Sequence, residues 1–511
     1  MKLFNDIQFN KPKKNKFDLS HEKKLTMKMG AMVPILLQEV IPGDQFRVNT
    51  EMLMRLQPML APIMHRVRVK TDYFFVPNRL VWDNWQKFIT GGEDGLSTNV
   101  SPYVLIETGI PANLIEKSTL WDYYGMPSFD PTGMPGQLKV NAMPFRAYQL
   151  IYNEYYRDQN LVPEITIAKT DGLEPNTAAM LKLRTSAWEK DYFTSALPFA
   201  QKGGPVSLPI DPVVNYKNIS IVKQSGTGAN ADGALSVDPI TGDLHDVSGT
   251  ARIENIQDIT NASTTINDLR VAVRLQEWLE KNARAGSRYI ESILAHFGVR
   301  SSDARLQRPE YLGGSSNPIV ISEVLSTFQF SGDPDGAPQG NMSGHGVSAG
   351  NVPGFKRSFE EHGFVIGIMR VLPKTAYQQG IPKFMTRTDK LEYAWPSFAQ
   401  LGEQEVRNQE LYFDKALPDA TNQGTFGYQS RYAEYKFNCG TVHGDFKTNL
   451  SFWHMGRIFA APPVLNESFI TADPTKRVFA VTDPTEDELL VQLYNSISAL
   501  RPLPYFNTPT L

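Results

Sequence analysis

The stretch HRVRVKTDYFFVPNRLVWDNWQKFITGG, His65 to Gly92, carries the clearest fold signal in this chain of 511 residues. From Arg66 to Phe75 the residues alternate between a charged face and an apolar face. A period of two is typical of a half-buried β-strand, because successive side chains point to opposite sides. Pro77 is expected to end the strand, and Gly91-Gly92 to close the short helical segment that follows.

This stretch also carries six aromatic side chains that we predict to be packing or subunit-contact anchors. They are Tyr73, Phe74, Phe75, Trp82, Trp85 and Phe88. The last three recur at helical spacing, which would also suit a cluster that stacks on a ligand. Because the chain has no cofactor or catalytic motif for such a cluster to serve, packing is the preferred interpretation.

Composition and charge exclude several classes of protein. The net charge is −3, which excludes a globally basic nucleic-acid binder and leaves a local basic patch as the route to nucleic acid. No run of about 18 apolar residues occurs, so no membrane span is expected. The single cysteine, Cys439, cannot form an intramolecular disulfide. Frequent Gly and Pro with 11% aromatic residues favour a loop-rich, mainly β body.

Residues 1–28 are a basic N-terminal arm, with eight lysines against three acidic residues. One interpretation is a solvated, disordered tail. The other is an internal arm that neutralises phosphates, with Phe4, Phe9 and Phe17 stacking on unpaired bases. The candidate nucleic-acid-binding residues are Lys11, Lys13, Lys14, Lys16, Lys23 and Lys24.

Helices and further strands are predicted along the rest of the chain. Residues 143–158 and 267–297 show apolar stripes at helical spacing, the second with a break at Gly286-Ser287. Strands are predicted over 318–330, 364–372 and 431–437, with a Gly/Ser/Pro-rich loop over 331–353. The stretch 364–372 is apolar on both faces, as a central strand would be.

Residues 203–264 differ in composition from the rest. They contain one aromatic residue, Tyr216, and seven acidic residues against three basic ones. A segment without large apolar anchors contributes little to a buried core. We therefore predict a surface excursion, in the form of a small β-subdomain.

The usual signatures of catalysis and metal binding are missing from the sequence. The eight histidines do not recur at metal-ligand spacing, and no nucleophile-elbow, Walker or Rossmann motif occurs. No catalytic residue, metal site or cofactor is therefore predicted. A rival hypothesis is a β-sandwich that binds or hydrolyses carbohydrate, with Glu360 and Glu361 as candidate acids.

Two blocks of sequence resemble a known family. IPGDQF at 41–46 together with the 65–92 stretch, and GVRSSDARLQRPEYLGG at 298–314, are similar to the major capsid proteins of microviruses, especially their gokushovirus-like branch. A weaker match is RPLP at 501–504. The resemblance implies an eight-stranded antiparallel jelly roll, mainly β, with large loop and helical insertions. It also implies a structural protein that is not an enzyme.

The resemblance further implies how the chain divides and what it meets. Residues 1–28 would be an internal arm, 29–202 and 265–511 the two parts of the jelly roll, and 203–264 an exposed insertion protruding at three-fold axes. Copies would join through pentamers into the simplest icosahedral shell around circular single-stranded DNA. The implied partners are an internal scaffolding protein, a small basic DNA-binding protein, a pilot protein and a host surface receptor. The implied location is the virion capsid, with assembly in the host cytoplasm.

Overall fold

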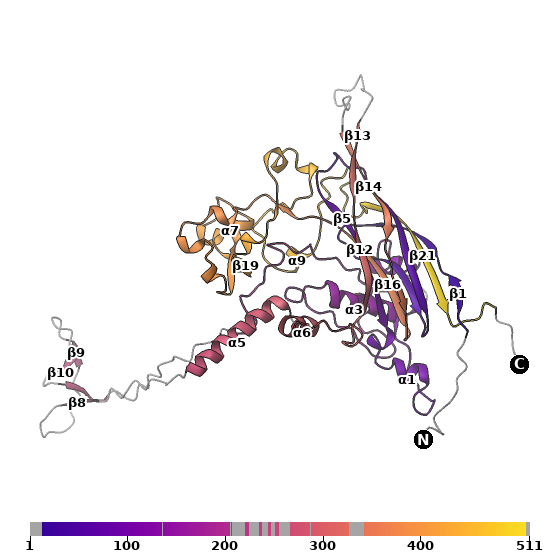
Figure 1. Ribbon diagram of the computed structural model, residues 1–511, viewed down its shortest axis with the longest axis horizontal. Coiled ribbons are helices and arrows are strands. Elements are labelled where there is room, and N and C mark those ends of the chain that lie inside the picture. The colour runs from indigo at the N-terminus through magenta and orange to yellow at the C-terminus, as the bar shows by residue number, and fades with distance from the viewer. Residues whose placement is uncertain are drawn as a thin grey trace. The chain divides into compact units, whose positions relative to one another are not determined.

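A computed structural model describes most of the chain and divides it into two compact units (Figure 1). The larger unit is Met1–Ala200 with Ala283–Leu511, and the smaller is Gln201–Asn282. The described residues are 13–134, 136–204, 206, 220–223, 235–237, 244–246, 251–254, 266–286, 288–325 and 342–506.

Two antiparallel sheets form the centre of the larger unit. The first has the order β1-β21-β4-β14-β13, with β2 also pairing with β21 and β15 with β4. Its strands are β1 (Asn15–Asp18), β2 (His21–Met27), β4 (Gln45–Leu56), β13 (Val320–Leu325), β14 (Met342–Val352), β15 (Lys356–Ser358) and β21 (Leu489–Arg501). The second sheet has the order β12-β5-β16-β3. Its strands are β3 (Val33–Val40), β5 (Val67–Pro77), β12 (Glu310–Pro318) and β16 (Gly363–Pro373).

The strand order is that of a jelly roll. In chain order, β2, β4, β14 and β21 build one sheet as β2-β21-β4-β14, while β3, β5, β12 and β16 build the other. The first and last strands are therefore neighbours, and the chain passes repeatedly from one sheet to the other. This exchange between the seven-stranded and the four-stranded sheet is the jelly-roll arrangement. The predicted mainly β fold with antiparallel sheets and helical insertions is confirmed.

The alternation of the 65–92 stretch places β5 between two hydrophobic cores. Val67, Val69, Tyr73 and Phe75 face the other sheet and belong to the core between the two layers. Phe74 points the opposite way, into a second core on the outer side of the four-stranded sheet. β16 lies between β5 and β3 and is buried on both faces, as its continuous apolar sequence predicts.

Helices and short strands cover the outer side of the four-stranded sheet. The predicted helix at 143–158 is present as α3 with a π-helical continuation, Tyr152–Tyr156, and its apolar stripe packs into the second core. The α-helices of the larger unit are α1 (Trp85–Thr90), α2 (Leu120–Tyr123), α3 (Met143–Ile151), α4 (Thr177–Leu181), α6 (Tyr289–Phe297), α7 (Asn408–Leu411), α8 (Asp419–Asn422) and α9 (Glu467–Ile470). Helix α5 (Ile266–Ala285) ends at Gly286, where the break was predicted, and α6 ends at Gly298 with a φ of 69°.

A third, smaller core lies in a side lobe that is built from short elements. It gathers residues such as Tyr192, Val406, Phe426 and Phe469. The paired short strands of the larger unit are β6 (Tyr103–Ile106) with β7 (Leu138–Asn141), β17 (Ala376–Tyr377) with β20 (Gly440–Thr441), and β18 (Glu403–Arg407) with β19 (Thr425–Ser430).

Two sequence predictions in this half of the chain are wrong. Residues 431–437 are not a strand: Tyr432 has a left-handed φ of 61° and a 3-10 helix follows over Ala433–Tyr435. The alternation there reflects a compact turn against the third core, with Ala433 fully buried. The loop predicted over 331–353 is partly strand, since β14 begins at Met342; glycines pack closely there, and a Cβ at Gly344 would meet the Ala61 carbonyl at 2.4 Å.

The sandwich begins earlier than predicted. Residues 1–12 lie outside the described part of the chain, but β1 and β2 occupy most of 15–27 and pair with β21. Met27 on β2 is fully buried in the core between the sheets. A boundary at residue 28 therefore separates β1 and β2 from the sheet to which they belong.

The smaller unit contains the predicted insertion at 203–264. Its described strands form two antiparallel pairs, β8 (Ser220–Lys223) with β11 (Ala251–Glu254) and β9 (Leu235–Val237) with β10 (Leu244–Asp246). In the chain, β9 and β10 lie between β8 and β11. Most of helix α5 also belongs to this unit.

Candidate subunit-contact and nucleic-acid surfaces

The three consecutive aromatic residues of β5 are internal packing residues. Tyr73 is fully buried, and its hydroxyl donates a hydrogen bond of 2.7 Å to Thr50 Oγ1 on β4 of the facing sheet. Burial raises the pKa of Tyr73 to about 12, although the bond to Thr50 opposes the shift. Phe75 packs on Phe359 at 4.7 Å between ring centroids, and Phe74 packs on Tyr155 at the same distance. These side chains hold the sandwich together and are not exposed to another molecule.

The second aromatic group, Trp82, Trp85 and Phe88, runs from the core to the surface. Trp82 is fully buried, while 40% of Phe88 is exposed. The Trp82 ring lies 4.8 Å from Phe88 and 6.0 Å from Trp85 between centroids. Phe88, at the outer end of this group, is the most exposed of the three and the best placed for contact with a second subunit.

Asp171 orients this group and was not found from the sequence. Its carboxylate accepts hydrogen bonds from Trp82 Nε1 at 2.5 Å, Asn84 at 3.1 Å and Asn99 at 2.6 Å. Desolvation opposes ionisation, but the hydrogen bonds outweigh it and the pKa of Asp171 lies below its usual value. A lone aspartate in a long irregular segment gives no sequence signal for this role.

Four of the six predicted DNA-binding lysines are exposed. Lys13, Lys14, Lys16 and Lys24 lie on the surface, although Lys14 donates to the Gly43 carbonyl and Lys24 is 3.7 Å from Glu22. Lys11 lies outside the described residues. Exposed lysines of this kind suit contact with phosphate groups.

Lys23 has a different environment. Its ammonium group donates to the carbonyl oxygens of Pro34 at 2.9 Å and Tyr123 at 2.5 Å. Burial lowers the pKa of Lys23 to about 8, although nearby Asp122 opposes the shift. Lys23 ties β2 to neighbouring segments and is not free to bind phosphate. The alternation of Lys23 with Leu25 and Met27 is the signal that would have placed it on the inner face.

The outer face of the seven-stranded sheet is open and polar. Register brings Arg47 on β4 directly opposite Lys356 on β15. Both side chains are exposed and line a hollow of about 590 Å³. This pair could not be found from the sequence, because its members are far apart along the chain.

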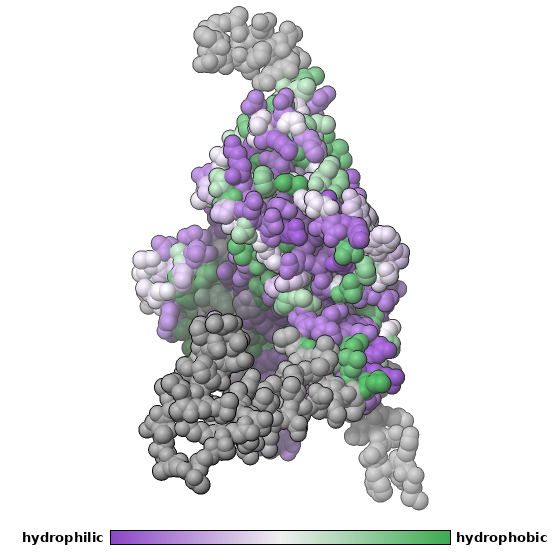
Figure 2. All heavy atoms as spheres, turned by 90° about the vertical axis from the view of Figure 1, so that its left-hand side faces the viewer, coloured by the Kyte–Doolittle hydropathy of each residue, from purple (hydrophilic) through white to green (hydrophobic). Residues whose placement is uncertain are grey.

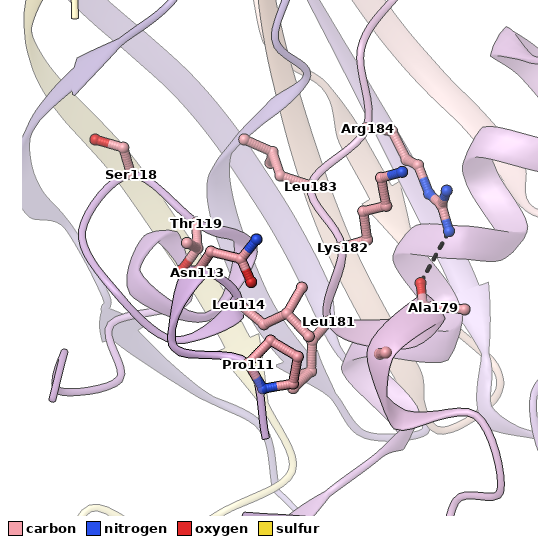
Figure 3. Close-up of a pocket in the computed structure, with 11 residues that line it drawn as sticks. Pro111, Asn113, Leu114, Ser118, Thr119, Ala179, Leu181, Lys182, Leu183 and Arg184 are labelled. Carbon is pink, nitrogen blue, oxygen red and sulfur yellow. Dashed lines mark hydrogen bonds between the residues drawn. The ribbon is translucent and has the colours of Figure 1, made fainter. Parts of the chain in front are cut away.

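Glu360 and Glu361 are not arranged as the catalytic acids of a carbohydrate-hydrolysing site would be. Glu361 binds Arg79, with 2.5 Å between Oε2 and Nε, and Glu360 is exposed beside it. A second hollow, of about 660 Å³, has only Lys182 and Arg184 as charged lining residues (Figure 3). Arg184 donates to the Ala179 carbonyl at 2.8 Å there. This hollow lacks the paired acid and base that hydrolysis needs.

Within the described ranges, no three His, Cys, Asp or Glu side chains come together as a group that could hold a metal ion. None of the helices in the described part of the chain is long and apolar enough to cross a membrane.

Comparison with known proteins agrees with the jelly roll and the signature blocks. Residues 5–511 match the family described as "Capsid protein (F protein)". The chain is 37% identical to capsid protein VP1 of Bdellovibrio phage phiMH2K, over 97% of this chain and 95% of that protein. It is 34% identical to capsid protein VP1 of Chlamydia phage 1 (99% and 97% covered) and 29% identical to that of Spiroplasma virus 4 (99% and 97%). The predicted resemblance to microvirus major capsid proteins is confirmed, and the family is structural and not enzymatic. This chain belongs to the capsid protein (F protein) family.

Proposed function

We propose that this capsid protein assembles, through pentamers, into an icosahedral shell that encloses a circular single-stranded DNA genome. The observation that carries the proposal is the family match over residues 5–511, which covers both the jelly roll and the insertion. A jelly roll with long connecting segments suits such a role, because a rigid sandwich presents variable loops for contacts that close by symmetry.

Helix α5 would form a contact between copies. Val271 and Leu275 lie one helical turn apart, and 59% and 45% of their side chains are exposed in the single chain. A helix with an apolar stripe normally buries it against another element. A second copy is the occupant that a shell-forming protein supplies.

Other apolar side chains are also available for contacts between copies. On the face drawn in Figure 2, hydrophobic residues are interspersed with hydrophilic ones over the described surface. Large apolar residues of the bigger unit that are more than half exposed include Met64, Leu96, Phe297, Phe384, Met385 and Leu401. Interspersed apolar and polar groups are typical of interfaces that form after the subunit has folded.

The N-terminal segment would contact the genome. Lys13, Lys14, Lys16 and Lys24 are exposed and belong to the same end of the chain as Lys11. Because β2 is a sheet strand, a deletion that tests this role must stop before β1. Removing residues 1–12 and changing Lys13, Lys14, Lys16 and Lys24 to Gln should lower the DNA content of particles and leave the sandwich folded. Unchanged DNA content per particle would exclude a genome-binding role for that segment.

The insertion at 203–264 would be the part that meets the host surface receptor, as a protrusion at the three-fold axes. The insertion belongs to a compact unit of its own, which supports this role because such a unit can vary without altering the sandwich. Particles with a shortened insertion should form but adsorb poorly to host cells. Normal adsorption by shortened particles would count against the proposal.

Assembly would take place in the host cytoplasm with three partners: an internal scaffolding protein, a small basic DNA-binding protein and a pilot protein. The decisive experiment is electron microscopy of this chain expressed with and without the scaffolding protein. Closed icosahedral particles or pentamers support the proposed function. A protein that stays monomeric under both conditions contradicts it.

A further inference from the structure

An unusual pair of like charges lies on the open face of the seven-stranded sheet. Phe46 and Val48 of β4 point into the core, so Arg47 between them points outward. The register pairs Arg47 with Lys356 of β15, and directly opposite residues share one face of a sheet. Two cations in this position repel each other and disfavour the strand pairing.

No carboxylate relieves this repulsion. Among the residues that the structure describes, neither Arg47 nor Lys356 forms an ion pair. The acid in the same row is Asp18, which lies across Ser498 on β1, about 10 Å from Arg47 by strand spacing. The Asp18 carboxylate already accepts hydrogen bonds from the Ser20 amide and hydroxyl. The two cations are therefore available to an anion from outside the subunit.

The hollow beside this pair has the chemistry of a phosphate site. Its volume is about 590 Å³ and no acidic residue lines it. Besides the two cations, its polar side chains are Asn49, Asn351, Ser496 and Ser498. Hydroxyl and amide groups join Arg and Lys as the common donors to phosphate oxygens in nucleic-acid complexes.

We propose that the Arg47–Lys356 hollow binds backbone phosphates of single-stranded DNA, and that the seven-stranded sheet faces the genome. This inference rests on the proposed enclosure of single-stranded DNA. Lys16 lies on the same face, where β1 pairs with β21, and extends the cationic surface towards the N-terminus. Two or three cations spaced along one face follow a flexible backbone better than a single point charge does.

Tyr494 favours nucleic acid over a carboxylate from a neighbouring subunit. It lies on β21 two residues before Ser496, so that both side chains point to the same face of the sheet. Its side chain is 40% exposed. Its cross-strand neighbours are Glu51 and Glu22, which repel phosphate. A strand that crosses here would place its backbone at Arg47 and stack a base on the Tyr494 ring. A protein carboxylate has no use for such an aromatic platform.

The test is binding of a fluorescein-labelled thymidine oligonucleotide of about 30 nucleotides, followed by anisotropy at several salt concentrations, to the full chain. The double variant Arg47→Gln/Lys356→Gln should bind about tenfold more weakly or worse at low salt. Its slope of log affinity against log salt should fall by about 1.4, for two lost contacts on a single strand. The matched control is Arg66→Gln/Arg68→Gln, which also removes two exposed charges. Arg68 lies on β5 of the four-stranded sheet, and Arg66 lies just before that strand. Its binding should stay close to that of the parent.

The outcomes separate this site from the proposed function. The melting temperature of the Arg47→Gln/Lys356→Gln variant should equal or exceed that of the parent, so weaker binding is not a folding defect. Parental binding by this variant, or equal losses in both double variants, would overturn the site and leave the shell proposal standing. A parent that binds no oligonucleotide would overturn both the site and the enclosure of DNA. Unchanged DNA binding with loss of self-association in sedimentation would assign the pair to a carboxylate of a second copy.

Discussion

Tyr73 on β5 and Thr50 on β4 join the two sheets by a hydrogen bond inside the hydrophobic core, with 2.7 Å between their oxygens. Thr50 in turn donates to Asn495 Oδ1 on β21 at 2.9 Å, and Asn495 donates to the Ile35 carbonyl on β3 at 3.2 Å. This chain of bonds crosses between the sheets twice. Every group in it is paired, so the polar residues define how the two layers sit on each other.

Removing the Tyr73 hydroxyl should therefore destabilise the subunit. Tyr73→Phe keeps the ring but takes one donor away from Thr50, and we expect a loss of about 0.5–1.5 kcal/mol in the free energy of unfolding. Thr50→Val should cost more, because it leaves both Tyr73 and Asn495 without their partner. Urea unfolding measures both. Tyr494→Phe, which removes an exposed hydroxyl, is the control and should change nothing.

The ion pair between Arg146 and Glu174 should be far more sensitive to substitution than one on the surface. Both side chains are fully buried, with 2.7 Å between Nε and Oε2, and Arg146 also donates to the carbonyl of Val81. Arg146→Met leaves a buried carboxylate without a counter-charge and should cost about 3–5 kcal/mol. Adding Glu174→Leu should restore part of the loss. A single variant as stable as the parent in urea would contradict this assignment.

The exposed pair of Arg274 and Glu277, at 2.6 Å, provides the comparison for that experiment. Both side chains remain more than half exposed, so solvent screens their attraction. Arg274→Met should leave the melting temperature of the chain nearly unchanged.

The depressed pKa of Lys23 should make stability depend on pH in a defined window. Burial lowers this pKa to about 8 from an ordinary value of 10.5. Between these values the unfolded chain holds a proton that the folded chain has lost, so stability rises with pH. This gain in stability is complete above pH 10.5, the pKa of Lys23 in the unfolded chain, and is lost as pH falls through about 8. Compared with Lys23→Met, the parent should gain stability between pH 8 and pH 10.

Lys24 is the matched control for this measurement. It follows Lys23 on β2 but points to solvent. A rise in stability that Lys23→Met loses and Lys24→Met keeps is assigned to the ammonium group of Lys23. If the difference in unfolding free energy between the parent and Lys23→Met is constant across the same pH range, the ammonium group of Lys23 does not titrate in the way proposed.

The apolar stripe of α5 gives a prediction about assembly. Val271→Glu together with Leu275→Glu places two charges on the exposed stripe and should reduce particle formation strongly, because charge at a buried contact must be desolvated. The melting temperature of the unassembled chain should change little. Sedimentation velocity measures the particle fraction. Lys281→Glu, on the polar side of the helix, should assemble normally, and equal effects of both changes would contradict the contact.

Sequence reasoning succeeded where the signal was local. The alternation around β5, the unbroken apolar run of β16 and the helix break at Gly286 were all predicted, because backbone geometry imposes their periods. It failed at 431–437, where a similar alternation belongs to a turn with Tyr432 in a left-handed conformation. It also treated Lys23 and Lys24 alike, although the structure buries one ammonium group and exposes the other.

By itself, the sequence determined the family, the mainly β class and the separate character of residues 203–264, since these depend on local pattern and composition. The tertiary structure alone decided which strands are neighbours. Pairing β4 with β15 brought Arg47 and Lys356 together, and pairing β2 with β21 placed residues 21–27 of the predicted arm in the sandwich. The physical reason is that strand neighbours are selected by burial of whole sheet faces across long sequence separations. No single segment contains that information.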